Sequence, residues 1–149
     1  MDKSGFIKIM NDNLKLVREE FGLTQEKMAA MIGISKKSLV ESEKGRRSLS
    51  WNEAALLACI FSGSSVIRSE IGEDAQEIVE AIAFSDCEVR YPSTMGGKIW
   101  WKVVEAKDDY KIQQNLVSNH YRLLDGKDRR LISSFDLEEV RKYLEEITR

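Results

Sequence analysis

The fold of the first half of this chain is decided by residues 22–47, GLTQEKMAAMIGISKKSLVESEKGRR. Two short segments with helical apolar spacing are separated here by Gly33 and followed by a basic cluster. Thr24 and Ser35 are good N-caps, and a glycine can turn the backbone through positive φ. The segment therefore predicts two helices joined by a tight turn.

Helical spacing continues on both sides of this segment. Upstream, one stripe carries Leu14, Val17 and Phe21 and ends at Gly22, which can cap a helix in the left-handed region. Downstream, Ser50 and Glu53 form a capping box that opens a helix with Leu56, Leu57 and Ile60 on its apolar stripe. Two further short helices are expected around residues 65–71 and 74–84.

After YPSTMGG (91–97) the apolar period changes to two, which is typical of strands. Four strands are expected in KIWWKVV (98–104), YKIQQNLV (110–117), HYRLL (120–124) and RRLISS (129–134), and Asp136 can cap a last amphipathic helix. Alternation sends Trp100 and Trp101 to opposite faces, so we expect one to pack under that helix. The predicted fold is α+β. An all-α five-helix domain (1–72) precedes a small β-meander-plus-helix domain (73–149).

Composition excludes several classes of protein. The 149 residues are 42% apolar and 32% charged with a net charge of −2, as in a soluble globular protein. The start lacks the pattern of a signal peptide, and no apolar run reaches membrane-spanning length. Cys59, Cys87 and the single His120 lack metal-ligand spacing. We therefore expect a cytoplasmic protein without metal or cofactor.

The charge is unevenly distributed. Residues 1–72 carry 11 Lys/Arg against 9 Asp/Glu, a net of +2, whereas residues 73–149 carry 12 against 16, a net of −4. Residues 36–47 hold five basic and two acidic side chains, a net of +3. A run of this kind is often only a solvated helix face.

The two helices and their glycine turn have the geometry of a helix-turn-helix, whose second helix can enter the major groove of DNA. From residue 14 to about 60 the chain resembles the helix-turn-helix of lambda-repressor and Cro-like regulators, also called the xenobiotic-response-element type. The matching residues are Arg18, LTQ (23–25), MA (28–29), GIS (33–35), Leu39 and EKGRR (43–47). Ser42 departs from the pattern, because the family usually has a large apolar or aromatic residue there. The departure predicts weaker packing of the second helix, or a gap that is filled from elsewhere.

The resemblance implies a sequence-specific regulator of transcription, a repressor, that binds double-stranded DNA as a homodimer. Lys36, Lys37 and Glu41 take the base-reading positions, where lysine donates to guanine and glutamate accepts from cytosine. Gln25 at a helix N-terminus and the cations after the second helix are expected to meet phosphates. The full predicted DNA-contacting set is Thr24, Gln25, Ser35, Lys36, Lys37, Ser38, Glu41, Lys44, Arg46 and Arg47.

Three side chains have a structural role or an alternative one, and the function has one competitor. Arg18 and Glu43 are expected to form a buried ion pair rather than DNA contacts, and Glu41 could equally pair with Lys37 along its helix. The function that competes with DNA regulation is an antitoxin or bridging protein-interaction module on the same fold.

The second domain is expected to serve dimerisation or the sensing of a small-molecule or protein effector. Its strands carry aromatic residues that could bind single-stranded nucleic acid, but its acidic balance disfavours this. His120 is expected to be a sheet-surface residue, and no catalytic motif is present, so we expect no enzyme activity.

Overall fold

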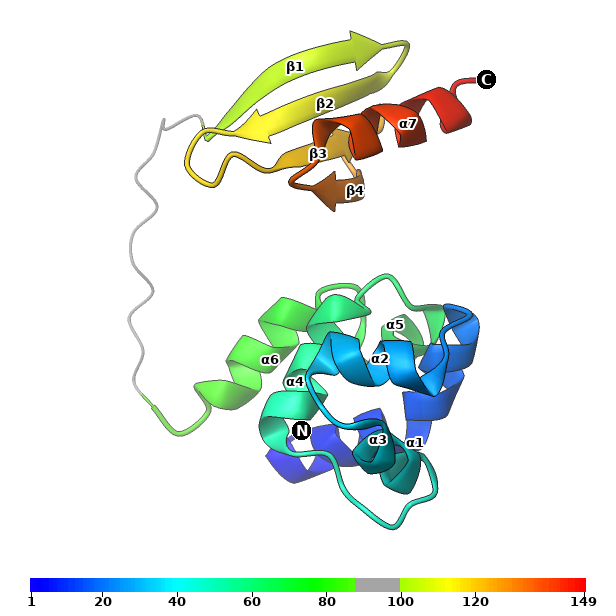
Figure 1. Cartoon of the computed structure of the whole chain (residues 1–149). Helices are drawn as coiled ribbons and strands as arrows, with labels where there is room; N and C mark the ends of the chain where they lie inside the picture. The colour runs from blue at the N-terminus through cyan, green and yellow to red at the C-terminus, as the bar shows by residue number, and fades with distance from the viewer. Residues whose placement is uncertain (88–99) are drawn as a thin grey trace. The chain divides into compact units, whose positions relative to one another are not determined.

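The computed structural model of this chain describes residues 1–87 and 100–149. Contacts between residues divide the chain into two compact units, Met1–Tyr91 and Pro92–Arg149. Figure 1 shows helices in the first unit and a sheet with one helix in the second. The predicted α+β class, with a helical part followed by a meander and a final helix, is confirmed.

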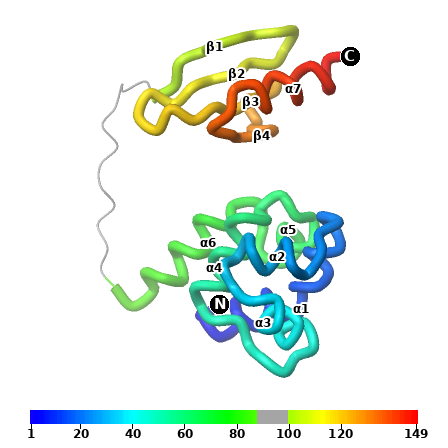
Figure 2. The backbone as a smooth tube through the Cα atoms, in the orientation of Figure 1, coloured from blue at the N-terminus to red at the C-terminus, as the bar shows by residue number. Residues whose placement is uncertain are grey.

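Each described helix of the first unit begins after a side chain that accepts a hydrogen bond from a backbone N–H of the first turn. These N-caps satisfy donors that have no partner within the helix. They are Asp2, Thr24, Ser35, Ser50, Ser64 and Asp74. The backbone tube in Figure 2 can be followed through the resulting helices, which are α1 (Lys3–Glu20), α2 (Gln25–Ile32), α3 (Lys36–Glu43), α4 (Trp51–Ile60), α5 (Ser65–Ile71) and α6 (Ala75–Ala83).

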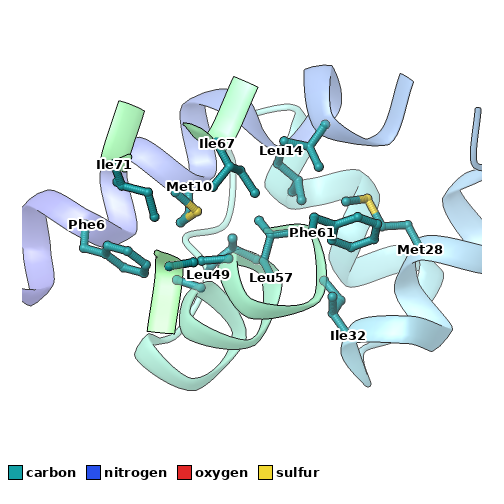
Figure 3. Close-up of a cluster of buried hydrophobic side chains, with 14 of the residues drawn as sticks. Phe6, Met10, Leu14, Met28, Ile32, Leu49, Leu57, Phe61, Ile67 and Ile71 are labelled. Carbon is teal, nitrogen blue, oxygen red and sulfur yellow. The ribbon is translucent and has the colours of Figure 1, made fainter. Parts of the chain in front are cut away.

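The core of the first unit is one apolar cluster to which all six helices contribute. Figure 3 shows Met10 and Leu14 of α1 gathered with Leu57 of α4 and Ile67 of α5, and all four side chains are at most 1% exposed. The faces of α2 and α3 that meet this cluster are held in place by its packing. Their opposite faces are left to solvent.

The last helix of the first unit, α6, lies beyond the predicted domain boundary at residues 72 and 73. Ala75 and Ile82 of α6 are 3% and 5% exposed and belong to the same cluster as α1 and α4. The first unit therefore extends further along the chain than expected. The physical reason is that α6 buries its apolar stripe against α4 and α5.

The helix α4 buries only one of the three apolar residues that the sequence analysis singled out, Leu57. Ala54, Leu57 and Ala58 are buried, whereas Leu56 and Ile60 are each 43% exposed. Small alanines at the buried positions let α4 approach its neighbours closely. Leu56 and Ile60 are consequently turned outward.

The second unit is an antiparallel four-stranded meander covered on one face by α7 (Leu137–Ile147). Its strands are β1 (Trp101–Lys107), β2 (Tyr110–Asn115), β3 (Tyr121–Leu124) and β4 (Arg130–Ser134), and each pairs with the next. Ile112 and Leu123 lie side by side in the register and pack against Val140 and Leu144 of α7. These four buried side chains form the core of this unit.

The prediction that one tryptophan packs under the final helix is wrong. Trp101 pairs with Asn115, three residues beyond Ile112, so alternation places it on the face opposite α7. There the Arg122 guanidinium lies 3.6 Å from the centroid of the Trp101 ring, and His120 meets the same ring edge-on at 5.0 Å. Trp100 precedes the strand and is 48% exposed.

The first strand lies later in the chain than expected. It runs from Trp101 to Lys107, beyond the predicted end at residue 104. Residues 98 and 99 of the predicted strand lie outside the described residues. Because β1 ends at Lys107, the turn into β2 is shorter than predicted, and Asp108 in this turn has a positive φ of 53°.

No single helix among the described residues is long and apolar enough to cross a membrane, although α4 and α5 would pass as a bent pair on length and composition alone. In residues 1–87 and 100–149, no three His, Cys, Asp or Glu side chains are grouped so that they could hold a metal ion. Cys59 and Cys87 are both exposed free thiols.

Candidate nucleic-acid interface

The turn between α2 and α3 is built from local hydrogen bonds. Gly33 ends α2 with φ 76°, in the left-handed region, and the backbone N–H of Ile34 donates to the carbonyl of Ala29 at 3.0 Å. The Ser35 hydroxyl oxygen then accepts from the N–H of Ser38 at 3.0 Å and starts α3. The chain therefore leaves one helix and enters the next within three residues.

Burial of one face orients this pair of helices. Met28 of α2 and Leu39 of α3 are fully buried, and Ile32 is 3% exposed. Lys36 and Lys37 occupy the first turn of α3 and are exposed. The start of α3 consequently presents two cations on a helix whose inner face is fixed by the core.

A buried polar junction ties α3 to α1 and α2. Arg18 Nε lies 2.5 Å from Glu43 Oε1, and Arg18 Nη2 donates to Glu43 Oε2 at 3.3 Å, with side-chain exposures of 15% and 5%. The predicted ion pair between these residues is thus present in the structure. Arg18 also donates to the carbonyl of Leu23 at 3.1 Å, so the loop before α2 is bound to the same junction.

Gln25 takes part in the same junction, which the sequence pattern did not indicate. Its Nε2 donates to Glu43 Oε2 at 2.9 Å, and the side chain is half-buried. Burial raises the pKa of Glu43, but hydrogen bonds from Arg18 and Gln25 outweigh this and hold the pKa below its ordinary value. Glu43 is therefore a carboxylate that joins three helices.

The outward polar side chains of α3 have partners that differ from those expected. Lys36 Nζ lies 3.2 Å from Glu26 Oε1 of α2, in an exposed pair. Glu41 pairs with Arg46 at 3.8 Å rather than with Lys37. Exposed pairs of this kind contribute little to stability, so both cations can exchange these partners for a phosphate or a base at small cost.

The loop after α3 is held in one conformation by its backbone. Gly45 has φ 74°, and the N–H groups of Arg46 and Arg47 both donate to the carbonyl of Glu41, at 2.9 and 3.2 Å. Asn11 of α1 holds the far end of the loop, because its Oδ1 accepts from the N–H of Leu49 at 3.1 Å. No sequence signal singled out Asn11, since 38 residues separate it from its partner.

An open polar groove of about 870 Å³ lies between α1 and this loop. Lys8 and Asp12 line it from α1, and Lys44 and Arg46 line it from the loop. Arg46 has a side chain that is 67% exposed. The loop therefore adds two outward cations, Lys44 and Arg46, beyond the end of α3.

Arg47 is directed differently from its neighbour. Its Nη1 donates to Ser42 Oγ at 3.1 Å, and its Nη2 donates to Glu53 Oε1 and Oε2 at 2.7 and 3.0 Å. Ser42 is 3% exposed and sits on the inner face of α3. Of the three predicted phosphate contacts in the loop, Arg47 alone is turned toward the protein.

Glu53 combines two roles at the start of α4. It accepts from the N–H of Ser50 at 2.9 Å, which completes the predicted capping box, and it binds Arg47. Burial raises the pKa of Glu53, but the hydrogen bonds from Arg47 and Ser50 outweigh it, so the pKa lies below its ordinary value. The capping box was readable in the sequence, whereas the bond to Arg47 was not.

The comparisons with known proteins agree with this geometry. The family described as Helix-turn-helix matches residues 14–65, which cover α2, the turn, α3 and α4, together with the C-terminal part of α1 and the start of α5. No match is found among the curated proteins or among solved structures.

The matched segment therefore belongs to the helix-turn-helix class of DNA-binding domains. Within that class it is of the lambda-repressor and Cro-like type, and the chain is a DNA-binding regulator whose partner is double-stranded DNA. The resemblance stated from residues 14 to 60 is confirmed over this part of the chain. The second unit lies outside the matched residues.

Proposed function

We propose that this protein is a sequence-specific transcriptional repressor that binds its operator as a dimer, with α3 in the major groove. The observation that carries the proposal is the first turn of α3. Lys36 and Lys37 are exposed there, while Leu39 one turn later is fully buried. A recognition helix needs this combination, because a fixed backbone places mobile cations at base edges.

In this proposal Lys36, Lys37, Ser38 and Glu41 read bases. Lysine can donate to guanine O6 and N7, and glutamate can accept from cytosine N4. Side chains and backbone N–H groups around the starts of α2 and α3 and the outward loop cations bind phosphates. These contacts come from Thr24, Gln25, Ser35, Lys44 and Arg46.

Support for a dimer comes from the second unit. Val103, Leu116, Val117 and Phe135 are large apolar residues that are 53%, 54%, 68% and 78% exposed. Exposed apolar side chains can form a contact with another protein chain where they lie together in one patch. We propose that this unit serves dimerisation or the binding of an effector.

The exposed apolar side chains also favour a second candidate function. A module that binds another protein, such as an antitoxin or a bridging factor, would use the same surface. The two functions differ in whether the chain selects a DNA sequence.

Selection of duplexes from a random library with the full chain, followed by footprinting, tests the proposal. We expect an enriched site with two half-sites about one helical turn apart. Lys37→Ala should weaken binding to the selected duplex by about 1–3 kcal/mol and leave binding to a scrambled duplex nearly unchanged. Lys142→Ala on α7 makes the same change of charge in the second unit and is the control.

Three results would contradict the proposal. No enriched sequence would favour the interaction module. An equal effect of Lys37→Ala on both duplexes would show that α3 does not read bases at this residue. Sedimentation of the chain as a monomer at micromolar concentration, with and without the selected duplex, would exclude the dimer.

A further inference from the structure

The inner face of α3 carries a small polar residue, Ser42, at a buried position. A large apolar side chain would fill this position in the resembled family, but serine is small and carries a hydroxyl group. Ser42 is 3% exposed, and a buried hydroxyl without a hydrogen bond is costly. The hydroxyl group therefore needs a polar partner.

Arg47 supplies this partner. The methylene groups of an arginine can cover apolar surface while its guanidinium satisfies polar groups. Nη1 of Arg47 donates to Ser42 Oγ at 3.1 Å, and the side chain is 33% exposed. The neighbouring Arg46 is 67% exposed and has one carboxylate at 3.8 Å, so the inward direction is particular to Arg47.

The other end of the Arg47 guanidinium is held by Glu53. Nη2 lies 2.7 and 3.0 Å from the two carboxylate oxygens, and the Glu53 side chain is 16% exposed. Because Glu53 also caps α4 through the N–H of Ser50, its own orientation is fixed. The bonds thus run from the last turn of α3 to the first turn of α4.

We infer that Arg47 is a positioning residue for the DNA contact and not a phosphate ligand. It sets the orientation of α3 against α4 and, through it, the placement of Lys36 and Lys37 in the groove. The inference rests on the proposed function, because placement of α3 has a consequence only if α3 reads DNA. The alternative is the role expected from the sequence, in which Arg47 binds a phosphate.

The two roles make opposite predictions for Glu53→Gln. If Arg47 binds phosphate, removal of a nearby negative charge leaves DNA binding unchanged or strengthens it. If Arg47 positions α3, the same substitution loosens its guanidinium and weakens binding. Gln can still accept from the N–H of Ser50, so the cap of α4 is retained.

The experiment measures fluorescence anisotropy of the full chain on its selected duplex and on a scrambled duplex, over a potassium chloride series. The variants are Arg47→Met, Glu53→Gln, the double variant, and Arg46→Met as the matched phosphate-contact variant. Far-UV circular dichroism first establishes a temperature at which every variant is folded. All affinities are measured there.

We expect Arg47→Met and Glu53→Gln each to weaken binding to the selected duplex by about tenfold, since each breaks hydrogen bonds of a charged pair. The salt slope should stay that of the wild type, and the double variant should be no weaker than the worse single variant. Arg46→Met should instead flatten the salt slope by about one phosphate contact.

Three results would overturn the inference. Arg47→Met could flatten the salt slope as Arg46→Met does, or Glu53→Gln could bind at least as tightly as the wild type. Variants that unfold at lower urea concentration but bind with wild-type affinity would assign Arg47 a purely stabilising role. Failure of the wild type to select any duplex is a separate outcome, which overturns the proposed function itself.

Discussion

The ion pair between Arg18 and Glu43 gives the most quantitative prediction for this fold. Arg18→Met keeps the length of the side chain but removes its charge, so that Glu43 stays buried with Gln25 as its remaining donor. Breaking a buried pair from one side costs about 3–5 kcal/mol. Because Gln25 still donates, we expect the lower end, ~3 kcal/mol.

That loss is large for a unit of this size. A domain of this length loses about 4–8 °C of melting temperature per kcal/mol, so the helical signal of the first unit should melt about 12–24 °C lower. Urea unfolding followed by circular dichroism at 222 nm measures the free energy directly, since six of the described helices lie in the first unit.

The pH dependence identifies the cause of the loss. In the wild type the pKa of Glu43 lies below its ordinary value of 4.5, so its stabilising contribution is present above that value and disappears as the pH falls through the lowered pKa. In Arg18→Met, burial remains without the cation, and the pKa of Glu43 should rise above 4.5. The stability gap between variant and wild type should therefore narrow as the pH falls from 7 toward 4.5.

A double variant, Arg18→Met with Glu43→Met, is the matched control. It removes the uncompensated charge and should recover much of the lost stability, because apolar pairs often replace buried ion pairs without loss. A gap that stays constant with pH, together with a double variant no more stable than the single one, would refute the reasoning. The loss would then come from packing and not from a buried charge.

Three further predictions concern other parts of the chain. The Ser64 and Ser65 hydrogen bonds lower the pKa of Glu20 to about 2, so its contribution is present above the ordinary 4.5 and lost as the pH falls toward 2. Glu20→Gln should therefore lower the melting temperature at pH 7 more than at pH 3, whereas Glu19→Gln should have little effect at either. A chain that ends at residue 87 should give the helical signal of all six helices of the first unit, whereas one that ends at residue 72 lacks α6 and should melt at a lower temperature. Equal melting temperatures would show that α6 adds nothing to the core. Leu144→Ala should cost the second unit about 2–5 kcal/mol without shifting the melting of the helical unit, and a shared shift would mean that the two units unfold together.

Much of the first unit could be predicted because its signals are local. Thr24, Ser35 and Ser50 were assigned as caps from the sequence, and each accepts its bond from an N–H three residues later. Gly33 and Gly45 have positive φ where the chain turns. Such features depend on a few consecutive residues, so they can be predicted from the sequence without knowledge of the tertiary structure.

The features that differ from the sequence-based predictions depend instead on contacts between residues that are far apart in the chain. The face on which Trp101 lies depends on strand register, and a shift of one residue would exchange the faces. The unit to which α6 belongs depends on which distant apolar surface is free to cover its stripe. Neither can be read from spacing along the chain.

The candidate site divides in the same way. The sequence by itself determined that α2 and α3 form a helix-turn-helix with Lys36 and Lys37 at the start of the second helix, because caps, glycines and apolar period act within one or two turns. Only the tertiary structure decided that Arg46 faces outward while Arg47 turns in to Ser42 and Glu53. The two arginines are adjacent in the sequence, and what separates them is a buried hydroxyl and a carboxylate that lie within reach only after α3 and α4 have packed.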